Sequence, residues 1–395
     1  MEKITDLCTG CTACVHVCPV KCITMVEDAE GYLNAKIDQT KCIDCGSCVR
    51  TCPQNHKDKC INGATKRVLV LRSKDDKLLK KSASGGVFAT IAKKFIQQGG
   101  VAVGAAYDDD LVVRHTIVNK VEDLWKLQNS KYVQSIIGDC FPKIKDLLKS
   151  GSKVLFSGTP CQVAGLRRYL KRDYDNLITA DIICHGVPSP KLFKEYVHWK
   201  SEKLNMEIGS VNFRDKADGW GQTLAFRPKS GNKVVDVIGP TDPYYENFLQ
   251  GNLHRPCCYD CHYTSQYRPA DITMGDYWGV EREHPGKYSY KGVSMLMLNT
   301  DHAVEFFKDY EDDFYWDEST FEKASRDNGN LRHPSTPGPL RNVIYKKMNE
   351  VSEKELFESV MAIDATLKNR IKIMIPSKLR LVIKVLKTWV GRVIK

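Results

Sequence analysis

The stretch "CTGCTACVHVCP", Cys8 to Pro19, places four cysteines at the spacing C-x2-C-x2-C-x3-C and ends on a proline. A second copy, "CIDCGSCVRTCP", runs from Cys42 to Pro53, offset by 34 positions. No apolar run precedes Cys8, so nothing resembles a secretory signal, and we expect the chain in the cytosol. Thiols in a reducing compartment bind metals or carry redox chemistry more often than they form disulfides. The two copies therefore predict metal sites.

This doubled spacing is that of the bacterial two-cluster ferredoxins, in which three close thiolates hold one 4Fe-4S cluster and the fourth crosses to the other. The rule assigns one cluster to Cys8, Cys11, Cys14 and Cys52, and the other to Cys42, Cys45, Cys48 and Cys18. Zinc held by four thiolates is the alternative, which two complete copies with both prolines make the weaker interpretation. Cys22 and Cys60 fall outside the pattern, and we expect them to be buried or incidental thiols.

The length and composition are those of an ordinary folded protein with two or three domains, since the 395 residues are 42% hydrophobic and 27% charged. No uninterrupted apolar stretch is long enough to span a bilayer. We expect a ferredoxin domain over 1–62, a second unit in two parts over 66–150 and 151–330, and a basic tail over 340–395.

Strands alternate with helices downstream of the cysteines. A strand, "VLVLRS", precedes the helix "SASGGVFATIAKKFIQQGG", and the same order recurs in "KVLFSGTPCQVAGLRRYL" and "LITADIICHGVPSPKLFKEYVHWK". This pattern predicts an α/β fold (α+β overall), with ligands at the carboxyl ends of the strands. The residues before the first helix, Ser82 to Gly86, predict either an anion site or only a cap. The sequence has no Gly-x-Gly-x-x-Gly or P-loop lysine motif, so neither a standard NAD site nor an NTPase is supported.

A further group of cysteines lies in "HRPCCYDCHYTSQYRPADITMGDYWG", His254 to Gly279. Cys258 and Cys261 form a C-x2-C pair next to Cys257, and the pair could gather with Cys161 and Cys184 into a third site. From the residues alone, a third cluster, a zinc site and unliganded thiols remain equally open.

The motifs "SASGGVF", "SKYVQS", "SGTPCQVAGL", "CHGVPSP" and "RPCCYDC" followed by "ADITMGDYWG" resemble, in order, those of the family of coenzyme F420 hydrogenase/dehydrogenase beta subunits. That family includes the beta subunits of F420-reducing hydrogenase and formate dehydrogenase, and 7-hydroxymethyl chlorophyll a reductase. The resemblance implies a flavin-binding α/β module whose FAD is lined by Ser84, Gly85, Gly86, Ser130, Lys131, Tyr132, Gly158, Thr159 and Pro160. It also implies a third 4Fe-4S cluster at Cys161, Cys184, Cys258 and Cys261. Cys257 stands where the family often has serine, so either Cys257 or Cys258 could be the cluster ligand at this point of the chain.

Three polar side chains are candidates to donate a proton or stabilise charge at the flavin ring: His185, Lys131 and Asp276. Each also has a plainer interpretation. The histidine could be structural, the lysine could neutralise a flavin phosphate, and the aspartate could hold a turn.

The C-terminal tail is basic and amphipathic. From Arg370 to Lys395 there are eight Lys or Arg and no acid, so +8 of the formal +11 lies here. One helical face collects Leu379, Val382, Ile383, Leu386, Trp389, Val390 and Val393. A basic amphipathic helix with a tryptophan indicates binding to a membrane surface. Docking of the same face onto the protein body or a partner is equally open, and no groove-reading motif supports nucleic acid.

These features favour an FAD- and 4Fe-4S-dependent oxidoreductase. It would be fed by ferredoxin or another one-electron donor and would act on a small or lipid-linked molecule. One alternative is the electron-transfer beta subunit of a larger hydrogenase or dehydrogenase that uses coenzyme F420. Another is a non-catalytic metal-binding scaffold. We expect a cytoplasmic protein whose tail would allow peripheral contact at the inner face of the membrane.

Overall fold

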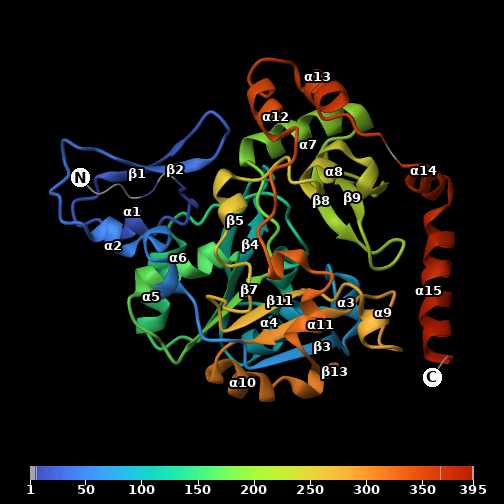
Figure 1. Ribbon diagram of the computed structural model, residues 1–395, viewed down its shortest axis with the longest axis horizontal. Coiled ribbons are helices and arrows are strands. Elements are labelled where there is room, and N and C mark those ends of the chain that lie inside the picture. The colour runs from blue at the N-terminus through green and yellow to red at the C-terminus, as the bar shows by residue number, and fades with distance from the viewer. Residues whose placement is uncertain (1–4, 6, 365, 394–395) are drawn as a thin grey trace.

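The N-terminal cysteine repeat folds into a ferredoxin-type unit at one end of the molecule (Figure 1). The computed structural model describes residues 5, 7–364 and 366–393. The unit contains two short helices, an antiparallel hairpin and two single turns: α1 (Ala13–Val17), β1 (Ile23–Glu27), β2 (Leu33–Ile37), α2 (Ser47–Thr51), η1 (Pro53–Asn55) and η2 (Lys57–Cys60). Left-handed backbone at Thr12 (φ 62°) and Gly46 (φ 66°) turns each cysteine loop back before its helix.

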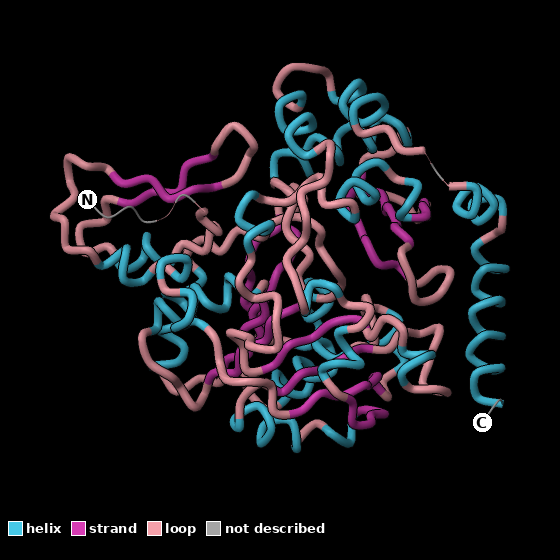
Figure 2. The backbone as a smooth tube through the Cα atoms, in the orientation of Figure 1, coloured by secondary structure: helices cyan, strands magenta, loops and turns pink. Residues whose placement is uncertain are grey.

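The body of the protein is built on an eight-stranded mixed sheet (Figure 2). Its spatial order is β13 (Phe314–Ser319), β3 (Arg67–Ser73), β12 (Ser294–Leu298), β11 (Ile272–Asp276), β7 (Leu177–Ile182), β6 (Val154–Gly158), β4 (Val101–Tyr107) and β5 (Val113–Val118). The central strands β11, β7, β6 and β4 are parallel, as strands alternating with helices predict. Strand β3 is antiparallel to both of its neighbours, β12 and β13, so the sheet is mixed.

Helices cover both faces of this sheet. One face packs against α4 (Val87–Gln97), η3 (Val121–Leu127) and α10 (Asp301–Lys308). The other packs against α5 (Cys140–Lys149) and α6 (Pro160–Leu170), and further along against α9 (Val280–Glu283), α11 (Phe321–Ser325) and η7 (Gly329–Leu331). The short elements α3 (Asp76–Lys80) and η6 (Glu311–Asp313) lie beside α4, and Lys94 of α4 donates to Asp313 of η6 at 2.8 Å.

A second core, rich in aromatic side chains, lies beside the sheet. It is built around a three-stranded antiparallel sheet of β8 (Ile208–Asp215), β9 (Thr223–Pro228) and β10 (Val235–Ile238). The surrounding helices are α7 (Pro190–Leu204), η4 (Gly239–Thr241), α8 (Pro243–Leu249), η5 (Pro256–Asp260), α12 (Arg341–Lys347), α13 (Glu353–Glu355) and η8 (Leu356–Val360).

The chain closes with α14 (Leu367–Met374) and α15 (Ser377–Val393), which stands along the side of the molecule opposite the ferredoxin unit (Figure 1). The large apolar side chains of one face of α15 are exposed, so of the alternatives for this face, docking onto the protein body is wrong for the described side chains. The side chain of Val393 lies outside the described residues. Within the described part of the chain, no helix is long and apolar enough to cross a membrane.

Candidate functional site

The structure brings the N-terminal cysteines together in two groups. Cys8, Cys11, Cys14 and Cys52 line one small cavity, and Cys18, Cys22, Cys42, Cys45 and Cys48 line another. Cys18 and Cys52 have each crossed to the group of the other repeat, which is the grouping that the ferredoxin rule predicts. Cys22 belongs with the second group, since its Sγ lies 3.5 Å from that of Cys18. The described residues contain no cluster of three or more His, Cys, Asp or Glu arranged for a single metal ion.

The chemistry of these thiols suits metal-bound sulfur. Burial raises the pKa of Cys11 to about 12, and burial also raises the pKa of Cys14. Free thiolates would therefore be disfavoured, whereas coordination to a metal deprotonates a thiol outright. Cys45 is exposed while Cys11 and Cys14 are buried, so the second group lies nearer to solvent.

Five more cysteines gather in the body of the protein. Cys161 lies in the first turn of α6, Cys184 follows β7, and Cys257, Cys258 and Cys261 lie on and beside η5. They are close enough for charge on one to oppose charge on the others. Burial and the neighbouring cysteines raise the pKa of Cys161, and burial raises that of Cys184 to about 12. The four predicted residues are thus together, and Cys257 has joined them as a fifth thiol. Cys60 is buried beside this group, as expected.

Helix α6 connects the first and third cysteine groups. Gly165 lies against Cys11, and a Cβ on that glycine would stand 2.8 Å from the Cys11 Cβ and 2.9 Å from its Sγ. Cys161 is four residues earlier on the same helix, a rise of about 6 Å. Only a glycine allows the ferredoxin loop to approach the helix this closely, so this contact sets the spacing between the two groups.

We predict that Gly165→Ala will displace Cys11. Alanine normally stabilises a helix by up to about 1 kcal/mol relative to glycine, but overpacking costs about 1–3 kcal/mol. The variant should therefore be less stable than the wild type and should hold the first cluster less firmly, as measured by denaturant unfolding and iron content. Gly63→Ala is the matched control, because a Cβ added at Gly63 would have nothing within 4 Å. Equal stability and iron content in both variants would contradict the proposed close packing.

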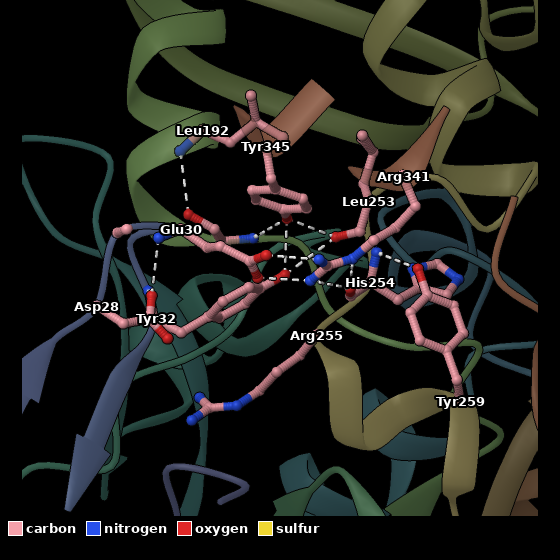
Figure 3. A network of polar contacts seen from close by, with 12 residues as sticks. Asp28, Glu30, Tyr32, Leu192, Leu253, His254, Arg255, Tyr259, Arg341 and Tyr345 are labelled. Atoms are coloured by element: carbon pink, nitrogen blue, oxygen red, sulfur yellow. Dashed lines mark hydrogen bonds and ion pairs between the residues drawn. The ribbon is translucent and has the colours of Figure 1, made fainter. Parts of the chain in front are cut away.

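A buried polar network fixes the ferredoxin unit to the body (Figure 3). The Tyr32 hydroxyl lies 2.7 Å from that of Tyr345 and donates to the Leu253 carbonyl at 3.1 Å. Arg341 on α12 donates to both carboxylate oxygens of Glu30 at 2.5 Å. The loop between β1 and β2 is therefore held rigidly against α12, and the cysteine groups keep one arrangement.

A cavity of about 320 Å³ lies at the carboxyl ends of β6, β7 and β11. Most of the residues that the family resemblance assigns to the flavin line it: Ser84, Gly86, Ser130, Lys131, Tyr132, Gly158 and Thr159. His185, Asp276 and Cys184 line the same cavity, which therefore adjoins the third cysteine group.

Two predicted residues do not line the cavity. Gly85 is packed behind it, where its amide donates to the Ser294 Oγ at 2.8 Å and a Cβ would meet the Leu71 carbonyl oxygen at 2.7 Å. Pro160 is buried at the first position of α6, where its missing N–H costs the helix nothing. Both residues shape the loops that line the cavity.

The N-terminus of α4 reaches this cavity without a side-chain cap. Gly86 precedes the helix with φ 80°, and neither neighbouring serine caps it. The Ser82 Oγ donates to the Leu78 carbonyl, and the Ser84 Oγ donates to the Val293 carbonyl. Of the two alternatives for this motif, the serine cap is wrong, and an anion-accepting helix end fits the geometry.

The three candidate polar residues lie in different surroundings. Asp276 accepts two hydrogen bonds from Arg214, at 2.8 and 3.1 Å, and one from the Trp220 Nε1 at 2.6 Å. Burial lowers the pKa of Lys131 to about 7, although its Nζ donates to the Gln128 carbonyl at 2.7 Å. Burial also lowers the pKa of His185. Asp276 therefore holds Arg214 in place. Lys131 is the candidate whose pKa lies near neutral pH, whereas burial favours the neutral form of His185.

Sequence reasoning missed Arg214 and His115, which also line the cavity. His115 contacts the Ser135 Oγ at 2.8 Å and the Ser157 carbonyl at 3.1 Å, and burial lowers its pKa to about 4. The only signal for Arg214 was the polar, glycine-containing run that follows it, "DKADGWG".

Comparison with known proteins matches two regions of this chain. Residues 151–324 match the family described as the C terminus of the coenzyme F420 hydrogenase/dehydrogenase beta subunit. This region belongs to that family. Residues 7–56 match the 4Fe-4S dicluster domain, so an iron-sulfur ferredoxin domain precedes the beta-subunit region.

Two relatives match across most of this chain. One, from Methanosarcina mazei, is named as a subunit of F(420)H(2) dehydrogenase and is 25% identical over 68% of this chain and 75% of its own length. An uncharacterized protein of Methanocaldococcus jannaschii is 27% identical over 77% of this chain and 86% of its own. A chain of the F420-reducing NiFe hydrogenase complex from Methanosarcina barkeri superposes with a TM-score of 0.46 at 19% identity, covering 73% of this chain and 89% of that one.

Proposed function

We propose that this chain exchanges electrons between its ferredoxin-type clusters and an organic two-electron partner bound in the large cavity. The observation that carries the proposal is the order of three sites along α6. The first cysteine group contacts Gly165, the third group includes Cys161, and the cavity begins at Thr159, just before the helix. Ferredoxin or a similar one-electron donor would meet the more exposed second group. Coenzyme F420 is the two-electron partner that the named relative favours.

We further propose FAD as the group held in the cavity. The uncapped N-terminus of α4 and the side chain of Lys131 suit a phosphate group. The aromatic rings of Tyr132, Phe248 and Trp278 line the cavity and suit a flat aromatic ring system. A bound flavin would supply the exchange between one-electron and two-electron chemistry. Arg214, fixed by Asp276, would place a permanent positive charge beside it.

A second candidate function is that of one component of a larger hydrogenase or dehydrogenase complex. The M. mazei relative is named as a subunit, which favours a protein partner. A non-catalytic scaffold is the third alternative. We place the chain in the cytosol, and its substrate among small or lipid-linked molecules rather than nucleic acids.

We expect the protein purified without oxygen to hold about eight irons in the N-terminal clusters and about four more in the third group. Denaturation should release FAD in near one-to-one amount, and the reduced protein should bleach the absorbance of added F420. Iron and sulfide assays, chromatography of the extract and absorbance spectra measure the three outcomes. Four or fewer irons after full reconstitution, or failure to bind FAD, would overturn the corresponding part of the proposal. A large subunit that co-purifies would favour the complex.

A further inference from the structure

Helix α15 presents its apolar side chains to solvent along its length. Trp389 is 63% exposed, Leu386 54% and Ile383 52%. The same outer surface includes Leu379, Val382, Val385 and Val390, and α14 adds Ile371, Ile373 and Met374. A soluble monomer rarely leaves so long an apolar strip uncovered.

The opposite face of α15 is basic and is bonded to the body. The Arg380 Nε lies 2.8 Å from Asp218, and the Lys384 Nζ lies 3.4 Å from the same carboxylate, which is fully buried. Lys387 pairs with Glu281 at 3.0 Å, and the Thr388 Oγ accepts from the Tyr290 amide at 3.1 Å. The helix is thus fixed in an orientation that turns its apolar strip outward.

We propose that the apolar face of α15, together with the end of α14, lies on the surface of an anionic lipid bilayer. Residues 370–395 carry +8, and the two body carboxylates offset −2 of it, so +6 remains for an anionic surface. The face contains a tryptophan and aliphatic residues, and Lys378 is exposed at its edge, where its long side chain can reach the headgroups. The charge favours lipid over a protein surface, since cationic residues near anionic lipid each add to binding.

This attachment is independent of the proposed chemistry but orients the molecule for it. Asp218, which holds α15, lies in the segment that continues to Trp220 and Gln222. The first of these bonds to Asp276, and the second lines the cavity. The ferredoxin unit lies at the opposite side of the molecule from α15 (Figure 1). The cavity wall would therefore lie near the bilayer, while the cysteine groups stay open to a water-borne donor.

Co-sedimentation of the full chain with lipid vesicles tests the proposal. The wild type should bind vesicles of phosphatidylcholine containing about one third phosphatidylglycerol, and at least about tenfold more weakly those of phosphatidylcholine alone. The double variant Leu386→Ser/Trp389→Ser should lose roughly a hundredfold in affinity, since two buried apolar side chains are removed from the lipid. Trp125→Ser, which removes a 61% exposed tryptophan on η3, is the matched control and should bind as the wild type does.

Because these side chains are exposed, the variants should keep wild-type unfolding curves and iron content. Ile383→Ser/Val390→Ser provides a second, independent pair. The proposal would be overturned if the wild-type protein does not bind anionic vesicles, or if the double variants bind them with wild-type affinity. A change of oligomeric state in these variants without lipid would also overturn it, because the strip would then be a protein interface.

Discussion

Replacing Cys184 with serine should remove about four irons and leave the two N-terminal clusters reducible. This cysteine follows β7, has no cysteine next to it in sequence, and is the member of the third cysteine group that lines the large cavity. Cys257 and Cys258 could each replace the other as a ligand, so substitution of either is less decisive. Changes to residues that merely support a metal ligand typically cost about 10- to 100-fold in metal affinity, and removal of the ligand itself should cost at least as much.

Iron analysis and the absorbance of the dithionite-reduced protein measure this outcome. Cys140→Ser is the matched control, because Cys140 is buried in α5 and belongs to none of the three cysteine groups. If Cys184→Ser keeps the iron content of the control, the third group is structural, and electrons pass to the cavity directly from the ferredoxin unit.

Replacing Arg268 with methionine should destabilise the protein by about 3–5 kcal/mol. Arg268 is 1% exposed, and its Nη2 lies 2.9 Å from the Oδ1 of Asp181, which is fully buried. The guanidinium also donates to the carbonyls of Tyr263 and Ile182. Methionine would fill much of the space but leave Asp181 buried without its counter-charge. Denaturant unfolding measures the loss.

The loss should depend on pH. Burial raises the pKa of Asp181 in the folded chain, so its contribution to stability falls as pH rises through that folded-state pKa. Arg268 opposes this shift, and without it the pKa should rise further. The deficit of Arg268→Met should therefore be largest at high pH and shrink once Asp181 takes up its proton. The double variant Asp181→Leu/Arg268→Met should recover stability. A single variant with a deficit independent of pH would contradict the assignment to this pair.

Short-range spacing made the ferredoxin unit and the ends of the central strands predictable. In the N-terminal repeat, each cysteine loop is closed by a turn at Thr12 or Gly46, so the order of residues nearly dictates the local geometry. The turns at Gly158 and Gly86 were likewise visible as glycine between a strand and a helix. These predictions rest on local backbone preferences, which a single sequence carries.

Features that depend on distant segments were not predictable in this way. Arg214 and Asp276 meet across 62 positions, and Asp218 holds Arg380 across 162. The amphipathic pattern of α15 was clear from the sequence, but the face that docks was not. That choice was decided by the carboxylates of Asp218, on a loop, and Glu281, on α9, both far away in the chain. The family motif predicted that Gly85 lines the cavity. It is instead packed behind the cavity, because its amide donates to Ser294 on β12, a strand far away in the sequence.

The polar network of Tyr32, Arg341 and Glu30, which fixes the ferredoxin unit to the body, has a kinetic consequence. Carrier domains on flexible tethers must diffuse to their acceptor before each transfer, and their turnover slows in a viscous medium. In this protein the ferredoxin unit is already fixed beside the third cysteine group, because its β1–β2 hairpin is hydrogen-bonded to α12 and its Cys11 loop contacts α6. Internal electron flow in this protein should therefore be indifferent to solvent viscosity, and only collision with the external donor should be limited by diffusion.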